Sequence, residues 1–255
     1  MKVTFLGTGT SQGVPIIGCN CETCLSEDSK DKRLRCAIML TLDDGKNIVI
    51  DTGPDFRQQM LRANVQDVEA VLITHEHNDH VIGIDDVRPI NFKQNKDMKV
   101  YAVERVIKEL KDRFKYVFAP NPYPGVPRVE LIPMHKSQPF EVAGQRIIPI
   151  EVMHYKLPVI GFRFNDFTYL TDIKTITDEE LEKVKGTKIL VVGALRRENH
   201  LSHMTIDEAI ALSQKINPEI TYFTHMSHVL GRHEEVIQTL PPNITLAYDG
   251  LELEL

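Results

Sequence analysis

A short segment rich in histidine and acidic residues constrains this chain more than any other feature. Residues 74–80 hold three histidines and two acids. They follow the apolar run Ala70–Ile73, which predicts a short buried strand, and the residues from Asp79 onward predict a helix start. The cluster therefore lies on a strand-to-helix loop, where a rigid scaffold presents side chains into a cleft. Zinc, manganese and iron accept imidazole and carboxylate, so two neighbouring metal ions are expected, one held by His75 and His77 and the other by Asp79 and His80.

Three further candidate ligands stand at the ends of apolar strands. His154 follows the predicted strand 146–152, Asp172 follows residues 168–171, and His225 follows residues 220–223. One such residue would mean little. Together with His75 they indicate a common edge at which several strands deliver side chains into one cleft. The alternation of strands and helices along the chain predicts an α/β layered fold.

A cysteine cluster near the N-terminus predicts a second kind of metal site. Cys19, Cys21 and Cys24 are three of the four cysteines in the chain. Close thiols in a reducing compartment indicate a metal rather than a disulfide framework, and structural zinc is nearly always four-coordinate. The loop 18–36 is therefore expected to bind zinc with a fourth ligand from elsewhere, a histidine. Cys36 begins an apolar strand and is expected to be buried.

Charge and length limit the class of protein further. The net charge of −6 and pI near 5.9 argue against a general nucleic-acid binder. No apolar run approaches the ~20 residues of a membrane span, and the N-terminus does not resemble a signal peptide, so a cytoplasmic location is expected. The 255 residues predict a single domain, 1–255, built of two halves, about 1–127 and 128–255. The proline-rich stretch 119–127 is the candidate seam or flap.

The segment His75-Glu76-His77-Asn78-Asp79-His80 resembles the signature of the metallo-β-lactamase superfamily, whose members are mostly dinuclear hydrolases. The resemblance implies an αββα sandwich, two β-sheets with helices outside. It also implies a ligand set, in which Asp172 bridges two metals, one bound by His75, His77 and His154 and the other by Asp79, His80 and His225. Asp51, after the strand 47–50, resembles the superfamily's acid that supports the metal loop from behind.

The expected chemistry is a metal-assisted hydrolysis. Two divalent ions ~3.5–4 Å apart can share a water, lower its pKa and neutralise phosphate oxygens. The leaving oxygen then needs a proton, which a histidine can supply. His203 lies just ahead of a helix that begins with a Thr205/Glu208 capping box, which resembles the place of the catalytic histidine in phosphodiesterase branches. His203 is the expected general acid, with His200 as the alternative, and Asp79 is expected to serve catalysis as well as metal binding.

Two further features narrow the resemblance. The segment 18–24, after Gln12-Gly13-Val14-Pro15, and the sequence His225-Met226-Ser227-His228 are similar to the phosphoribosyl 1,2-cyclic phosphate phosphodiesterase branch. This similarity implies that His228 completes the structural zinc site with Cys19, Cys21 and Cys24. It also implies a small phosphodiester substrate, either that cyclic phosphate or a 2′,3′-cyclic nucleotide, and two active-site Mn or Zn ions. The oligomeric state stays open, with a homodimer among the alternatives. Arg33, Arg35, Arg196 and Arg197 are more typical of solvated surface than of phosphate contacts.

Two other functions stay open. A tRNA 3′-end processing endonuclease shares the metal chemistry, but the chain has no long basic arm and is acidic overall. A non-catalytic accessory protein of cofactor biosynthesis, like a pyrroloquinoline-quinone biosynthesis protein with a similar cysteine loop, shares the fold. The presence of every expected ligand type argues against that reading.

Overall fold

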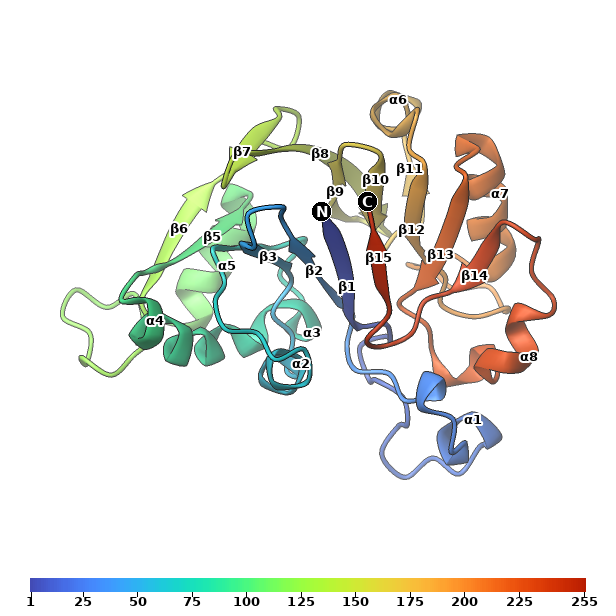
Figure 1. Cartoon of the computed structure of the whole chain (residues 1–255), viewed down its shortest axis with the longest axis horizontal. Coiled ribbons are helices and arrows are strands. Elements are labelled where there is room, and N and C mark those ends of the chain that lie inside the picture. Colours follow the sequence, from blue (N-terminus) through green and yellow to red (C-terminus); the bar gives the residue numbers. More distant parts are fainter.

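The computed structural model describes residues 1–255 and contains two β-sheets that share a buried apolar layer, with helices on the outside (Figure 1). The first sheet has the order β15-β1-β2-β3-β4-β5-β6, with strands at Glu252–Glu254, Lys2–Gly7, Ala37–Thr41, Asn47–Ile50, Ala70–Leu72, Met98–Ala102 and Val129–Pro133. The second has the order β11-β8-β9-β10-β12-β13-β14, with strands at Thr175–Ile176, Gln145–His154, Leu157–Phe164, Phe167–Leu170, Ile189–Gly193, Ile220–Thr224 and Ile244–Leu246, and β7 (Phe140–Val142) pairs with β8. The expected αββα sandwich is confirmed.

Helices cover the outer face of each sheet. The first sheet carries α2 (Phe56–Arg62), α3 (Asn78–Val81), α4 (Arg88–Gln94) and α5 (Glu104–Arg113), with the 3-10 helix η2 (Ile82–Val87) between α3 and α4. The second carries α6 (Asp178–Val184), α7 (Ile206–Ile216) and α8 (His233–Ile237). Three short helices lie in the cysteine loop and near it, α1 (Glu22–Leu25), η1 (Ser29–Asp31) and η3 (His228–Leu230). No helix combines the length and the apolar character needed to cross a bilayer.

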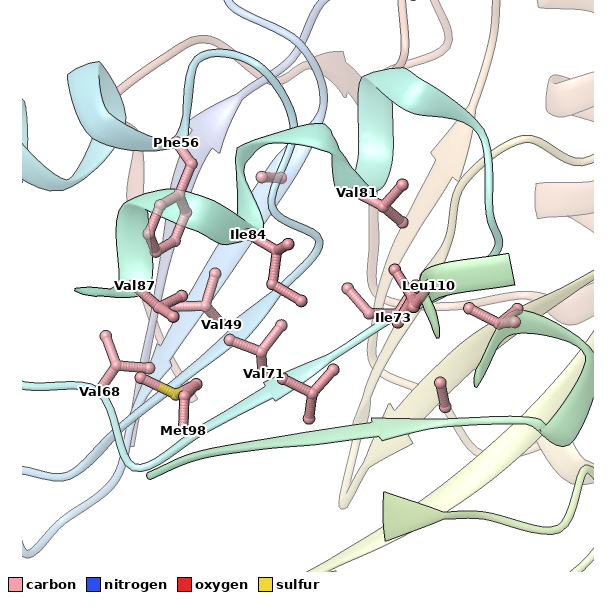
Figure 2. Close-up of a cluster of buried hydrophobic side chains, with 14 of the residues drawn as sticks. Val49, Phe56, Val68, Val71, Ile73, Val81, Ile84, Val87, Met98 and Leu110 are labelled. Atoms are coloured by element: carbon pink, nitrogen blue, oxygen red, sulfur yellow. The ribbon is translucent and has the colours of Figure 1, made fainter. Parts of the chain in front are cut away.

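Strand β4 shows why the segment before the histidine cluster is apolar throughout. Ala70 and Leu72 face the core between the two sheets, whereas Val71 and Ile73 face the core beneath the helices. In that outer core, Val71 lies with Val49, Ile84 and other apolar side chains (Figure 2). A strand buried on both faces reads as a continuous apolar run rather than as an alternating one.

Strand direction brings the candidate ligands to one edge. In the first sheet β3 to β6 run parallel, and in the second β10, β12, β13 and β14 run parallel. The loops after β4, β10 and β13 therefore leave at carboxyl ends of parallel strands, where side chains of an α/β sheet meet in a cleft. The two sheets also touch there, since the backbone N–H of Ile160 in β9 donates to the carbonyl of Thr74 at 3.0 Å.

Two strands from the second half of the chain, β6 and β15, belong to the first sheet. The expected boundary at residue 127 is displaced, because β6 pairs with β5 and belongs to the first sheet. The proline-rich stretch joins α5 to β6 within that sheet, and Arg88 donates to the carbonyl of Gly125 within it at 3.2 Å. At the other end of the chain β15 pairs antiparallel with β1, so the two termini lie close together (Figure 1). Backbone pairing between distant segments sets this boundary, and composition does not reveal it.

Candidate active site

The loop after β4 gathers three imidazole rings. The ring centroids of His75 and His77 are 4.6 Å apart, and those of His75 and His80 are 4.3 Å apart. His77 stands just before α3, and His80 lies inside that helix, so the turn into the helix folds the cluster back on itself. His75 and His80 are fully buried. The loop therefore presents side chains inward, as its place between a strand and a helix predicts.

The second sheet adds three side chains to the same place. His154 ends β8, and its ring centroid lies 5.3 Å from that of His77. Asp172 lies between two histidines, with Oδ2 at 3.2 Å from Nε2 of His80 and Oδ1 at 3.3 Å from Nε2 of His225. The structure thus brings all seven expected ligands together from both sheets.

The ligand atoms form overlapping groups rather than two separate sets. Asp79, His80 and His225 have ligand atoms within 4.8 Å of one another, as do His75, His80 and Asp172. The expected trio for the second metal is thus already compact. His77 enters no such close group, and it is the exposed member of the loop. Asp172 shares one group with His75 and another with His154, both expected on the first metal.

Unpaired ring nitrogens fit a metal centre. Nε2 of His75, Nε2 of His80 and both ring nitrogens of His225 are buried without a hydrogen-bond partner. Buried polar atoms are rarely left unpaired unless water or an ion satisfies them. His154 instead uses Nδ1, which donates to the carbonyl of Ser202 at 2.8 Å and leaves Nε2 free. Such a bond fixes the tautomer and the ring orientation of a metal-binding histidine.

Three residues of this site have left-handed backbone conformations. Asp51, Asp172 and His225 have φ values of 67°, 48° and 57°. Residues other than glycine seldom adopt this left-handed region, and strained residues cluster at functional sites where packing holds them. All three are buried, and each follows a strand that points at the cleft.

The carboxylates around His80 favour the charged form of its ring. Burial disfavours a charged imidazole, yet Asp172, Asp51 and Asp79 together raise the pKa of His80 well above its usual value. Burial likewise opposes ionisation of Asp172, but His225 and His80 lower the pKa of that carboxyl well below its usual range. Burial and then the charge of His80 lower the pKa of His75, which is therefore neutral. The carboxylates thus keep one imidazolium at His80.

Metal binding should therefore depend on pH through His80. A metal ligand must be a neutral imidazole, so binding at the site of Asp79, His80 and His225 displaces the proton. Affinity should rise by about tenfold per pH unit while His80 stays protonated without metal. We expect this slope in Mn²⁺ titrations by calorimetry between about pH 6 and 8. A flat affinity over that range would contradict the displaced proton.

Asp51 supports the loop from beneath and contacts both parts of it. Its carboxylate accepts from the backbone N–H and the hydroxyl of Thr74 and lies 2.7 Å from Nδ1 of His80. Burial raises the pKa of Asp51, although His80 opposes the shift. Gly53 packs so closely that a Cβ there would lie 2.2 Å from the carbonyl oxygen of Asp79. Nothing in the sequence marks Thr74 as part of this support.

Replacing Asp51 by alanine should weaken metal binding. The variant loses the acceptor that orients His80 and Thr74, and such supporting contacts typically contribute about 10–100-fold to metal affinity. Titration of Mn²⁺ into wild-type and variant protein measures the change. Asp112→Ala is the matched control, because Asp112 is exposed on α5 and forms no ion pair. Equal affinity in the Asp51 and Asp112 variants would contradict the supporting role.

The two candidate acids differ in position. The ring of His203 lies 4.3 Å from that of His154 and 4.7 Å from that of His225, centroid to centroid. The ring of His200 lies 5.0 Å from that of His203, further from the ligands. Burial, and then the neighbouring His225, lowers the pKa of His203 to about 2. His203 is thus neutral in the free site, and it faces the carboxylate of Asp172 at 3.8 Å.

The cysteine loop meets the C-terminal half as the resemblance implies. The Sγ atoms of Cys21, Cys19 and Cys24 lie 3.3, 3.4 and 3.6 Å from Nδ1 of His228. Tetrahedral zinc with bonds of about 2.3 Å to sulfur and 2.0 Å to nitrogen places these atoms about 3.5 Å apart. The backbone N–H of Cys24 and the ring of His228 lower the pKa of Cys21 to about 6, toward the thiolate that binds zinc.

One arginine differs from its expected place. Arg33 is buried rather than solvated, and its guanidinium donates to the hydroxyl of Thr8 at 2.9 Å and to the carbonyl of Ala247 at 2.7 Å. It also lies 3.2 Å from Nδ1 of the buried His233. These contacts tie the cysteine loop to the C-terminal segment. Arg35, Arg196 and Arg197 keep contact with solvent.

This fold and this cluster of histidines and aspartates define a class of metal-dependent hydrolases. Residues 46–226 match the family model of the beta-lactamase superfamily domain, and the chain belongs to the metallo-β-lactamase superfamily. A crystal structure of a diphosphatase from the PhnP family is 41% identical, with a TM-score of 0.92 over 99% of this chain and 96% of that one. Within the superfamily, the protein is therefore PhnP-like.

Two other proteins are similar to this chain. A Porphyromonas gingivalis protein named octanoyltransferase is 44% identical over 254 residues, which is 99% of this chain and 51% of that protein. The chain thus spans about half the length of that curated relative. Zinc-bound PqqB from Methylobacterium extorquens has a TM-score of 0.81 over the full length of both chains, but its 19% identity shows the fold alone.

Proposed function

We propose that the protein is a dinuclear phosphodiesterase that opens small cyclic phosphates, such as phosphoribosyl 1,2-cyclic phosphate or a 2′,3′-cyclic nucleotide. One observation supports this proposal above the others. Buried, unpaired imidazole nitrogens and the carboxylate of Asp172 converge in one cluster, and His203 stands against two rings of that cluster. This arrangement supplies both a cation site and a proton donor.

Each of the seven expected ligands has a role in the proposed metal centre. His75, His77 and His154 would hold one divalent ion, Asp79, His80 and His225 the other, with Asp172 between them. Bound Mn²⁺ or Zn²⁺ supplies Lewis acidity and lowers the pKa of a water molecule toward neutrality. Asp79 stays ionised, because His80 and then His225 lower its pKa despite burial, so it can accept a hydrogen bond from the attacking water. The site of the three cysteines and His228 would hold a third, structural zinc ion.

His203 handles the leaving oxygen. A ribose alkoxide is a strong base and cannot depart without a proton. The neutral His203 takes up a proton from solvent when an anionic phosphate arrives, since a negative charge nearby favours the imidazolium. The imidazolium passes that proton to the leaving oxygen, and the attacking water releases its own proton to solvent, so the number of protons balances over the reaction. His200 is the alternative donor, and its ring lies 5.0 Å from that of His203.

Hydrolysis of a phosphoanhydride is the second candidate. The 41% identity to a PhnP-family diphosphatase favours it. Both reactions place a water-derived nucleophile on phosphorus and differ in the leaving group. A phosphate leaving group is a far weaker base than a ribose alkoxide, so it depends less on His203. Reactivity toward the two leaving groups therefore separates the candidates.

Manganese-loaded protein should be assayed against a panel of substrates. The panel holds phosphoribosyl 1,2-cyclic phosphate, a 2′,3′-cyclic nucleotide, a nucleotide diphosphate ester, a precursor tRNA and an octanoyl thioester, the last because of the P. gingivalis relative. Fast turnover of a cyclic phosphate supports the proposal. Turnover of the diphosphate alone moves the function to the second candidate, and cleavage of the tRNA moves it to end processing. Metal-loaded protein that turns over none of them would support the accessory role.

A further inference from the structure

Glu76 stands between two expected metal ligands without being one. It lies between His75 and His77, and one oxygen of its carboxylate pairs with the guanidinium of Arg105 in α5. The Glu76 side chain is 15% exposed, and its other oxygen is buried without a partner. The segment that carries the two histidines is therefore tied to α5 through an ion pair whose carboxylate is mostly buried and whose guanidinium is 36% exposed.

Arg105 reaches a second ligand-bearing segment at the same time. Its Nη2 donates to the carbonyl of Pro158 in β9 at 2.6 Å. Pro158 pairs with Met153 across the β8–β9 hairpin, and His154 ends β8 next to that pair. One planar guanidinium thus bridges the loop with His75 and His77 to the hairpin with His154. The fixed fork of arginine suits two acceptors held apart, which a lysine cannot match.

A second arginine of α5 restrains the same loop. Nη1 of Arg113 donates to the carbonyl of Glu76 and to Oδ1 of Asn78, both at 2.7 Å. Neither arginine forms a hydrogen bond or an ion pair with the segments that carry Asp172 or His225. The two contacts of Arg105 therefore fall on the segments that carry His75, His77 and His154, whereas Arg113 also contacts Asn78, the neighbour of Asp79.

The ligands that Arg105 restrains form the less compact of the two expected sets. Asp79, His80 and His225 already form a compact group, and His80 is held from beneath by Asp51. His77 is exposed and belongs to no close group, so the backbone of its loop and its ring contacts with His75 and His154 set its position. We infer that Arg105 is a positioning residue for one metal only, the ion held by His75, His77 and His154. The inference rests on the proposed dinuclear centre and names the residue that makes its two sites unequal.

The test reads metal occupancy, not activity. Manganese-loaded protein is dialysed against falling Mn²⁺ concentrations, and electron paramagnetic resonance separates spin-coupled pairs from single ions. The wild-type protein should keep the spin-coupled signal at Mn²⁺ concentrations about 10–100-fold lower than those that Arg105→Ala requires. The variant should retain a single ion at Asp79, His80 and His225 with wild-type affinity. Glu76→Gln keeps the shape of the side chain and should shift the coupled signal in the same direction.

A control variant and a zinc count separate a specific effect of Arg105 from loss of charge or of folding. Lys108→Ala removes a cation from the same helix, at an exposed position without an ion pair, and should leave both affinities unchanged. Retention of one zinc ion per chain, counted by mass spectrometry, shows that each variant is folded. A coupled signal with equal Mn²⁺ dependence in wild type and Arg105→Ala would overturn the inference alone, as would equal weakening of both sites. No coupled signal in wild type would overturn the dinuclear function, and the inference with it.

Discussion

Replacing His203 by alanine should lower kcat on a cyclic phosphate by about 10²–10⁴-fold, the usual contribution of a general acid. The imidazole lies against the rings of His154 and His225 but is not one of the expected ligands, so metal content should stay at the wild-type value. Steady-state kinetics with metal analysis of the same samples measures both. KM should rise less than kcat falls, because the proton is transferred in the transition state, although the imidazolium also attracts the bound phosphate.

The leaving group provides the sharpest check on that role. Nitrophenolate is a weak base and leaves a nitrophenyl phosphodiester without being protonated. On this substrate His203→Ala should therefore lose much less activity than on the cyclic phosphate. His200→Ala is the matched control, since it removes an imidazole from the same loop at a greater distance from the ligands. An equal loss on both substrates would assign His203 a binding role instead, and a larger loss in the His200 variant would exchange the two residues.

Replacing Cys21 by serine should lower the free energy of unfolding more than the other substitutions, because it removes a ligand of the expected structural zinc. Structural zinc contributes about 10–16 kcal/mol of apparent binding free energy in small zinc peptides at neutral pH. The cysteine loop has little apolar core of its own, and it keeps Ile17 and Leu25 exposed. Each kcal/mol moves Tm by about 2–4 °C in a chain of this size, so we expect Tm to fall by about 10 °C or more. Scanning calorimetry with zinc analysis measures both changes.

The fourth cysteine separates zinc loss from any loss of a thiol. Cys36 is buried between the sheets, where its sulfur contacts the hydroxyls of Tyr169 and Thr224, both at 3.1 Å. Cys36→Ser should therefore destabilise the core while the zinc count stays at the wild-type value. Activity should fall in Cys21→Ser as well, because His228 lies three residues after His225 on the same short segment. A Cys21→Ser protein with unchanged zinc content and Tm would contradict a structural zinc site.

Local features of this protein could be predicted from its sequence. The apolar run at β4 is buried on both faces, and the histidine loop follows it as expected. Pro89 lies in the first turn of α4, where its missing N–H has no partner within the helix to lose, so this helix start is also a local feature of the sequence. The boundary between the halves could not be predicted, because the pairing of β6 with β5 depends on backbone hydrogen bonds between distant segments.

The sequence by itself determined the kinds of ligand and their local spacing, because neighbouring residues on one loop have few ways to be arranged. It also placed His154, Asp172 and His225 at strand ends. Only the tertiary structure decided how these residues meet, since the parallel register of β10, β12 and β13 and the contact between the sheets set their separation. The raised pKa of His80 and the bridge made by Arg105 also depend on the folded chain, because burial and the approach of charges distant in sequence exist only there.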